Sequence, residues 1–271
     1  MLVAALDGHR HVCDEREEVL AVEEGRRPQP IAAAGRYGQG PDSSGPRVGC
    51  VTDVSGARWP VAIFDLDGTL ADTVDLIVES YQYAFRTVIG QEEDPAVIRS
   101  WIGRPLIQAF RDHSPAHAED LYETYLRWNT DNTERLIRSY DGARETLVAL
   151  ADAGVKVGVA TSKRRESAQQ AMDILGLTDH VQTLVGMEDT EVHKPDPTPL
   201  LLALKRLGES DPSRAVYVGD AVVDVLAGKA AGMATVAVTW GAGVRDALSQ
   251  VRPDGLATTT AELSNLLLPS R

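Results

Sequence analysis

Short hydrophobic runs, rich in valine, recur along the chain from residue 61 onward. They occupy residues 61–64, 155–160, 181–185, 215–218 and 235–238. Short continuous runs of this kind are typical of β-strands that are buried on both faces of a parallel sheet. The stretches between them carry hydrophobic residues at helical spacing, and a glycine follows each: residues 144–153, 166–175, 198–207 and 222–231. Strands that alternate with helices predict a doubly wound, Rossmann-like α/β core.

The interval between the first two runs breaks this alternation. It holds about 90 residues, far more than the dozen or so that a single crossover connection requires. Helical stretches fill most of it, at residues 74–89, 95–101, 105–113 and 115–129. We therefore expect an all-helical cap, residues 74–137, inserted into a core made of residues 59–73 and 138–271. The insertion follows the carboxyl end of the first strand, at the edge where open α/β sheets bind ligands.

Residues 1–58 differ from the rest of the chain. Glycines and prolines recur there without a period among charged residues, which indicates a flexible N-terminal extension or upstream sequence included by a misplaced start. His9, His11 and Cys13 alternate within this segment and offer metal-ligand atoms. In so polar a stretch, solvated side chains are the favoured interpretation.

Composition and charge limit the partners of this chain. Its 271 residues carry a formal net charge of −13, with a sequence pI of about 4.9, so its surface repels nucleic acid and anionic membranes. No hydrophobic run approaches the roughly 20 residues that span a bilayer, and residues 1–6 are too short for a signal-peptide core. Two cysteines without C-x-x-C spacing, Cys13 and Cys50, indicate free thiols. We expect a cytoplasmic protein.

Two aspartates, Asp65 and Asp67, follow the first hydrophobic run. Because alternate residues of a strand share a face, their carboxylates emerge together at the strand's end. Adjacent carboxylates repel unless one is protonated or a cation lies between them, and Mg²⁺ prefers such oxygen ligands. One carboxylate can then act as a nucleophile while the other transfers protons. Gly68 permits a sharp turn with its amide facing an anion; the alternative is an ordinary turn with Asx hydrogen bonds.

Three further motifs follow where predicted strands end or loops begin. In chain order they are Thr161-Ser162, Lys194-Pro195, and Gly219-Asp220 with Asp224. Singly, each has a plain interpretation as a strand-end threonine, a surface lysine or a helix N-cap aspartate. Together with the Asp65-Leu-Asp67-Gly68-Thr69 stretch, and in this order, they resemble the motifs of the haloacid dehalogenase-like hydrolase superfamily. The resemblance spans residues 60–268.

The resemblance implies a phosphatase with an aspartyl-phosphate intermediate. Asp65 would be the nucleophile, and Asp67 would protonate the leaving group and then activate water. Thr161 and Lys194 would stabilise the transferring phosphoryl group. Contacts with the substrate would come from the backbone amides of Leu66 and Asp67 and from other residues of the first two motifs: Gly68, Thr69 and Ser162.

The same resemblance implies a Mg²⁺ cofactor. Its ligands would be a carboxylate oxygen of Asp65, the backbone carbonyl of Asp67 and the carboxylate of Asp220. Asp224, one helical turn later, would hold Lys194 or a metal-bound water.

The inserted helices resemble the small cap of the phosphoglycolate phosphatase-like branch. Within them, residues 102–106 resemble the substrate loop of that branch. Gly103 would allow close approach, and Arg104 would clamp a carboxylate or a second phosphate; a solvated arginine is the equal alternative. The implied partner is a small phosphorylated metabolite resembling phosphoglycolate, while the oligomeric state is not indicated.

Other activities of the superfamily differ in the residues that they require. Dehalogenases lack the second aspartate of the first motif, which is present here as Asp67. Phosphonate hydrolases require a cap lysine, and residues 74–137 contain none. A sugar phosphomutase and a pyrophosphatase stay open as alternatives. A binding module without turnover would lack a catalytic residue, and every motif residue is present.

Overall fold

The computed structural model describes residues 57–268, which belong to one compact unit of the chain, residues 50–271. The extension expected over residues 1–58 lies almost wholly outside the described residues, as do His9, His11, Cys13 and Cys50. Near the start of the described part, the amide of Arg58 donates to the carbonyl of Leu267 at 3.0 Å. Over residues 57–268, no helix combines the length and the hydrophobicity that crossing a membrane requires.

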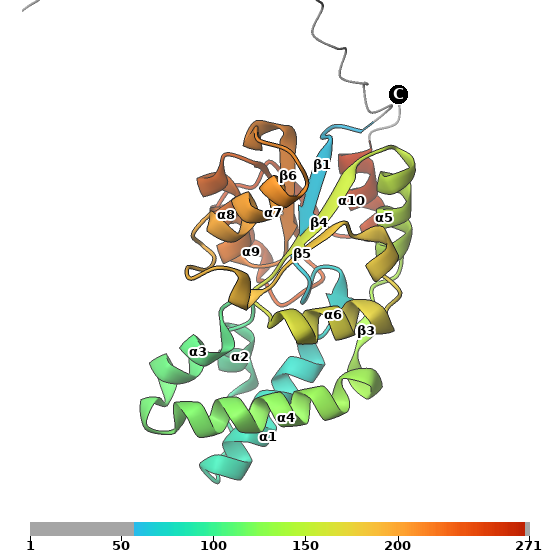
Figure 1. The fold of residues 1–271 in the computed structure, drawn as a ribbon. Helices are drawn as coiled ribbons and strands as arrows, with labels where there is room; N and C mark the ends of the chain where they lie inside the picture. Colours follow the sequence, from blue (N-terminus) through green and yellow to red (C-terminus); the bar gives the residue numbers. More distant parts are fainter. Residues whose placement is uncertain (1–56, 269–271) are drawn as a thin grey trace, which may run out of the picture. The chain divides into compact units, whose positions relative to one another are not determined.

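The core is a six-stranded parallel sheet with the strand order β5-β4-β1-β6-β7-β8 (Figure 1). Its strands are β1 Val61–Phe64, β4 Lys156–Ala160, β5 Thr183–Val185, β6 Ala215–Gly219, β7 Ala234–Val238 and β8 Gly255–Ala257. All five predicted strands are present, and the doubly wound α/β fold is confirmed. The short edge strand β8 was not predicted from the sequence.

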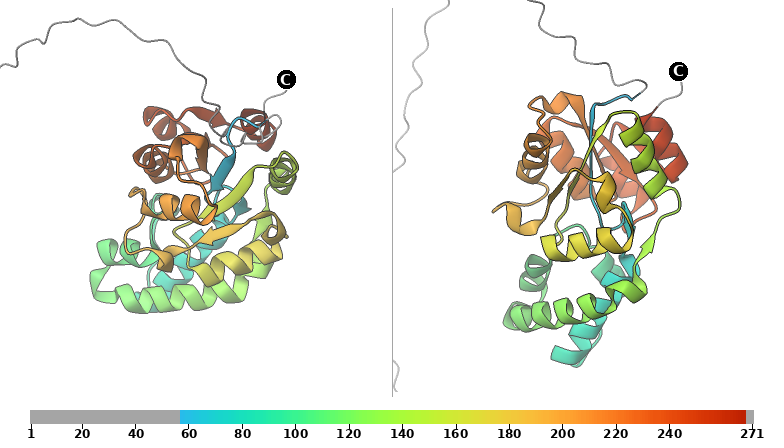
Figure 2. Two further views of the ribbon diagram at one scale, coloured as in Figure 1. Left: turned by 45° about the horizontal axis from the view of Figure 1, so that its top comes forward. Right: turned by 45° about the vertical axis from the view of Figure 1, so that its right-hand side comes forward.

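Helices cover both faces of the sheet (Figure 1, Figure 2). Along β1, Ala62 and Phe64 pack into one hydrophobic cluster, which also holds residues of α5, α6 and α10. Val61 and Ile63 pack into the opposite cluster with residues of α7 and α8, beside α9. The helices are α5 Ala143–Asp152, α6 Arg165–Ile174, α7 Thr198–Arg206, α8 Val222–Ala231, α9 Arg245–Gln250 and α10 Thr260–Leu267. Short 3₁₀ turns are η2 Thr178–His180, η3 Met187–Asp189 and η4 Pro212–Arg214.

The predicted helical insertion is confirmed. It comprises α1 Val74–Val88, α2 Pro95–Arg99, α3 Leu106–His113, η1 Pro115–His117 and α4 Ala118–Leu136. The last of these helices, α4, was predicted over residues 115–129 and instead spans Ala118–Leu136. A two-stranded antiparallel ribbon, β2 (Ala71–Asp72) and β3 (Arg138–Ser139), joins the cap to the core.

The cap has a hydrophobic core of its own. The ring of Tyr81 lies at its centre, with ring-centroid distances of 5.3 Å to Trp101, 5.0 Å to Phe110 and 4.9 Å to Tyr125. Aromatic clusters bury large areas and fix the relative positions of the helices that carry them. The cap therefore presents a fixed surface beyond the carboxyl ends of the strands, where Figure 2 shows α1 and α4 side by side.

Candidate active site

Asp65 lies at the centre of the carboxyl edge of the sheet. It directly follows β1, which pairs with β4 on one side and with β6 on the other, and its amide donates to the carbonyl of Val218 at 2.8 Å. Thr161 directly follows β4, and Asp220 directly follows β6. The parallel register therefore brings these three side chains to one edge, where all three are buried.

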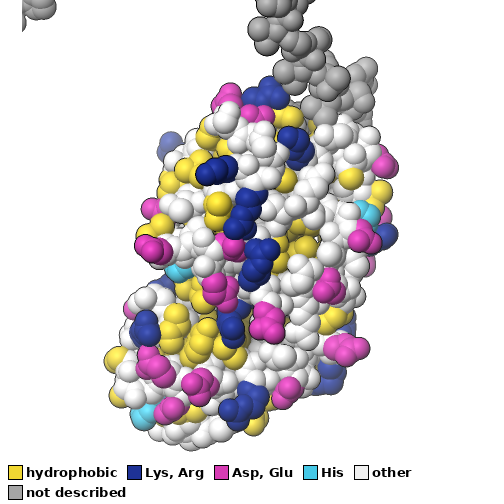
Figure 3. All heavy atoms as spheres, in the orientation of Figure 1, with side chains coloured by type: hydrophobic (Ala, Val, Ile, Leu, Met, Phe, Trp, Pro, Cys, Tyr) yellow, Lys and Arg dark blue, Asp and Glu magenta, His cyan; other side chains and the backbone are white. Residues whose placement is uncertain are grey.

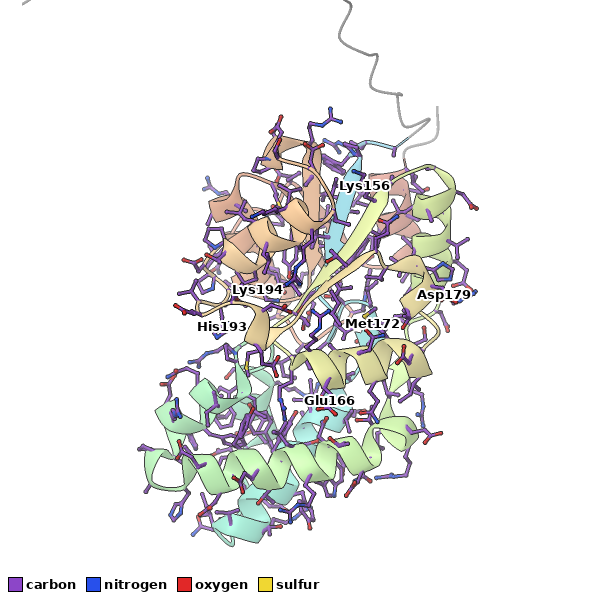
Figure 4. The ribbon with its side chains drawn as sticks, in the orientation of Figure 1. Lys156, Glu166, Met172, Asp179, His193 and Lys194 are labelled. Carbon is purple, nitrogen blue, oxygen red and sulfur yellow. The ribbon has the colours of Figure 1, made fainter. Side chains whose placement is uncertain are left out.

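Lys194 enters the site from the loop between β5 and α7, as Figure 4 shows. Its Nζ donates to Oδ1 of Asp224 at 2.7 Å and to the hydroxyl of Tyr217 at 3.1 Å. The same Nζ lies 3.1 Å from Oδ1 of Asp65. That third contact lacks hydrogen-bond angles, and Oδ1 of Asp65 has no hydrogen-bond partner among the described residues. The contact is therefore electrostatic, and it leaves this oxygen available to another ligand.

Asp220 and Asp224 are held in place by the surrounding chain. Asp220 accepts a hydrogen bond from the hydroxyl of Thr69 at 3.1 Å and from the amide of Ala242 at 2.8 Å. Asp224 accepts from the amide of Ala221 through Oδ2 at 2.9 Å, at the start of α8. Its other oxygen accepts from the buried lysine, so both oxygens of Asp224 are engaged within the protein.

Burial and charge shift the pKa values of this cluster. Burial is the main cause that raises the pKa of Asp65 from 3.8 to about 7; Lys194 opposes the rise, and Asp224 and Asp67 add to it. Burial, followed by the charges of Asp224 and Asp65, raises the pKa of Asp220 to about 8. For Lys194, burial acts to lower the pKa, but Asp224 and Asp65 hold it well above its usual value. The site thus crowds more carboxylates together than one ammonium can balance.

The crowded carboxylates fit a divalent cation. Carboxylate oxygens of Asp65, Asp220 and Asp224 lie within 4.8 Å of one another, and Mg²⁺ takes hard oxygen ligands of this kind. The orphaned Oδ1 of Asp65 supplies a ligand atom. A Cβ atom on Gly68 or Gly241 would lie 2.4 Å or 2.2 Å from Oδ2 of Asp220, so both positions require glycine beside this carboxylate. The donor set and its space therefore suit Mg²⁺.

Asp67 points toward different partners. Its Oδ1 accepts a hydrogen bond from the hydroxyl of Thr73 at 2.8 Å. The ammonium of Lys163 lies 3.1 Å and 3.3 Å from its two carboxylate oxygens. Sequence reasoning missed Lys163. Its only signal is its position directly after the Thr161-Ser162 pair.

A pocket lies between the cap and the core, above Asp65 and Asp67. It encloses about 640 Å³ of space, a figure that includes open solvent at its mouth. The core contributes Thr161, Ser162 and Lys163 to its wall, and the cap contributes mainly aromatic and aliphatic side chains from α1 and α4. Figure 3 shows hydrophobic side chains gathered over α3, with charged groups of both signs around them.

The cap meets the core at Gly103. The hydroxyl of Ser162 donates to the carbonyl of Gly103 at 2.9 Å. Gly103 has φ +92°, and a Cβ atom there would lie 3.0 Å from Cβ of Ala221. A glycine is needed for both reasons, and this contact fixes the cap over the carboxyl edge.

Most of the sheet, from β1 to β7, and the carboxyl edge with its aspartates fall within one family description. The model of the haloacid dehalogenase-like hydrolases matches residues 62–238. The chain belongs to this family.

Named relatives of this haloacid dehalogenase-like hydrolase include pyrophosphatases. Pyrophosphatase PpaX of Bacillus pumilus is 34% identical over 201 residues, which cover 74% of this chain and 93% of the relative. Pyrophosphatase PpaX of Bacillus velezensis is 34% identical over 209 residues, which cover 77% of this chain and 96% of the relative.

Solved structures have the same fold. A hydrolase of Pseudomonas syringae superimposes with a TM-score of 0.69 at 25% identity, over 76% of this chain and 96% of that one. A predicted phosphoglycolate phosphatase of Haemophilus somnus superimposes with a TM-score of 0.68 at 23% identity, over 76% of this chain and 96% of that one. At that identity the second likeness concerns the fold alone.

Several side chains that were expected to contact the substrate of this hydrolase already interact with other groups of the protein. The side chain of Leu66 is buried in the core, which does not bear on the contact expected from its backbone amide. The hydroxyls of Thr69 and Ser162 are already donated to Asp220 and to the cap. Arg104 lines the pocket, but its guanidinium is paired with Asp112 of α3. Thr161, in contrast, lines the pocket close to both aspartates of the first motif.

Proposed function

We propose that this haloacid dehalogenase-like hydrolase is a Mg²⁺-dependent phosphatase that acts on a small phosphorylated metabolite through an aspartyl phosphate on Asp65. The observation that carries the proposal is the 3.1 Å contact between Nζ of Lys194 and Oδ1 of Asp65. A buried ammonium beside a carboxylate oxygen that has no hydrogen-bond partner can offset the repulsion between that nucleophile and an anionic phosphoryl group.

The reaction uses two carboxyl groups in turn. The carboxylate of Asp65 attacks phosphorus, and the bond between phosphorus and the leaving oxygen breaks as Asp67 gives that oxygen a proton. Asp67, now ionised, takes a proton from water, and the resulting nucleophile attacks the phosphorus of the aspartyl phosphate. Inorganic phosphate leaves and the carboxylate of Asp65 is restored. Lys194 and the hydroxyl of Thr161 stabilise the oxygens of the transferring group.

Asp65, Asp220 and the backbone carbonyl of Asp67 would hold the metal ion. Bound there, Mg²⁺ supplies positive charge to the phosphoryl oxygens and to the acids that otherwise repel one another. Each oxygen of Asp224 already accepts a hydrogen bond from the protein, so its main part is to orient Lys194. Thr69 and the amide of Ala242 orient Asp220 in the same way.

Pyrophosphate hydrolysis is the second candidate. It is favoured by the relatives named pyrophosphatase PpaX, which are 34% identical to this chain. Both candidates share the same attack on phosphorus and differ only in the leaving group. The sugar phosphomutase alternative would use the same residues but release no net phosphate.

A phosphate-release assay tests the proposal. The purified chain should release phosphate from p-nitrophenyl phosphate with Mg²⁺ and should lose this activity in EDTA. Asp65→Asn should lower turnover at least about a thousandfold, while Asp246→Asn, at an exposed position of α9, should not change it. Undiminished turnover in Asp65→Asn would refute the assignment of Asp65 as the nucleophile. A panel with phosphoglycolate, pyrophosphate and sugar phosphates then separates the candidates.

A further inference from the structure

The wall of the pocket opposite Asp65 is largely apolar. Its side chains come from α1, α4, the loop after α2 and the turn after β5, and they include Ile77, Trp101, Tyr122, Tyr125, Leu126 and Met187. A leaving group that lies against this apolar wall is removed from water. An inorganic phosphate would lose hydration that such a wall cannot replace, whereas an organic group with an apolar face gains from its burial.

The cations that line the pocket are already paired. Among its described lining residues these are Arg104, Lys163 and Arg164. Arg104 is paired with Asp112, Lys163 with Asp67 at 3.1 Å, and Arg164 with Glu188 at 3.1 Å. Arg104 and Arg164 are therefore balanced by carboxylates that take no part in the proposed reaction, and Lys163 is balanced while Asp67 is ionised. This half of the pocket offers little net charge to an anionic leaving group.

Asn129 places a hydrogen-bond acceptor in this apolar wall. It lies on α4, is 3% exposed and lines the pocket. Its Nδ2 donates to Oγ of Ser80 at 2.9 Å, and that hydroxyl donates to the carbonyl of Leu76 at 2.6 Å. Because the single hydroxyl proton of Ser80 is used on Leu76, Oγ must accept from Asn129, and this fixes which way the amide points. Oδ1 of Asn129 accepts no hydrogen bond from the described residues. It is also absent from the unpaired side-chain atoms that are fully buried, so a ligand in the pocket can reach it.

We propose that the cap selects phosphate monoesters whose leaving group is a neutral alcohol with an apolar face and a further hydroxyl, which donates to Oδ1 of Asn129. This inference rests on the proposed phosphatase function and narrows its substrate class. A buried acceptor discriminates strongly, because a ligand that lacks the donor leaves the acceptor unpaired. It also disfavours pyrophosphate, whose leaving group is an anion without an apolar face.

Binding of unreactive analogues tests the inference without turnover. The ligands are benzylphosphonate, its three hydroxybenzyl isomers and imidodiphosphate, measured by calorimetry with MgCl₂ on the full chain. At least one hydroxy isomer should bind about tenfold more tightly than benzylphosphonate, and imidodiphosphate should bind more weakly than both. Tighter binding of imidodiphosphate, or no gain from any hydroxyl, would overturn the inference.

Variants on α4 assign the effect to one atom. In Asn129→Leu, the ratio of the affinity for the hydroxy isomer to that for benzylphosphonate should fall to about one. The affinity for benzylphosphonate itself should change by no more than about threefold. Asn132→Leu is the matched control, because Asn132 lies on the same helix, donates to the carbonyl of Trp128 and does not line the pocket. Equal losses for both ligands in Asn129→Leu would show a structural role instead. Phosphate release from p-nitrophenyl phosphate is measured separately. Absence of turnover together with an intact binding preference would refute the proposed phosphatase function but not the proposed ligand preference.

Discussion

Lys194 and Asp224 form an ion pair inside the protein, with Nζ 2.7 Å from Oδ1 and each side chain 1% exposed. Lys194 lies in the loop before α7 and Asp224 in α8, 30 positions apart in the chain. Their pairing ties the loop before α7 to the first turn of α8 and holds the ammonium beside Asp65. The electrostatics of Asp65, the proposed nucleophile, and the stability of the core therefore depend on the same contact.

Lys194→Met should make this double dependence measurable. At pH 8 without metal, we expect the free energy of unfolding to fall by about 3–5 kcal/mol, because the buried carboxylates lose their cation. At pH 5 the loss should be smaller, since the raised pKa values of Asp65 and Asp220 let these groups stay protonated. Denaturant unfolding at both pH values checks the difference, and Lys205→Met on the exposed surface of α7 is the control. An equal loss at both pH values would contradict the electrostatic explanation.

The stability of the metal-free wild-type chain should fall as the pH rises. Asp65 and Asp220 have folded-state pKa values of about 7 and about 8, against 3.8 when unfolded. Their contribution is complete below pH 3.8 and is lost as the pH rises through these folded values, because the folded state binds more protons in that window. Adding Mg²⁺ should raise the melting temperature more at pH 8 than at pH 5, since the ion binds the ionised acids. Thermal melts in EDTA and in MgCl₂ measure this, and Asp220→Asn should flatten both trends.

Strands buried on both faces are the part of this fold that the sequence reveals best. Their neighbours on each side exclude water, so every position is apolar, as in Val61–Phe64. The edge strand Gly255–Ala257 was missed because it offers one large hydrophobic residue, Leu256, and begins with a glycine. The extent of α4 was also misjudged, because its last turns carry polar residues and are defined by packing against α1.

Some residues of the candidate site can likewise be predicted from short local motifs, whereas others depend on contacts between distant parts of the chain. Asp65 and Asp220 stand at strand ends within short motifs, so their meeting follows from the parallel register. Lys163 is different, because it lies 96 positions from its partner Asp67, and its place directly after Thr161-Ser162 does not by itself distinguish it from a solvated lysine. The pairing of Arg104 with Asp112 likewise depends on how α3 is placed relative to the segment that precedes it.

Lys163→Met tests whether the residue that sequence reasoning missed matters to the proton donor. Lys163 and Thr73 set the position of Asp67, with the Lys163 and Asp67 side chains only 10% and 13% exposed. We expect kcat/KM to fall by about 10- to 100-fold for an alkyl phosphate, whose leaving oxygen needs a proton. The fall should be smaller for p-nitrophenyl phosphate, whose leaving group departs without one. Equal losses for the two esters would show that Lys163 acts on binding and not on proton transfer.

Gly103 and Gly90 form a matched pair that separates backbone strain from closure of the cap. Both have positive φ, +92° and +80°, but a Cβ atom at Gly103 would meet Ala221 at 3.0 Å, whereas at Gly90 nothing lies within 4 Å. Alanine at either position should cost about 1 kcal/mol of stability, because an L-residue is strained in this conformation. Only Gly103→Ala should also push the cap from the core, weaken the contact with Ser162 and lower kcat/KM by about tenfold or more. Unfolding and steady-state kinetics on both variants check this, and activity lost equally in Gly90→Ala would mean that strain alone, not the approach of the cap to α8, controls turnover.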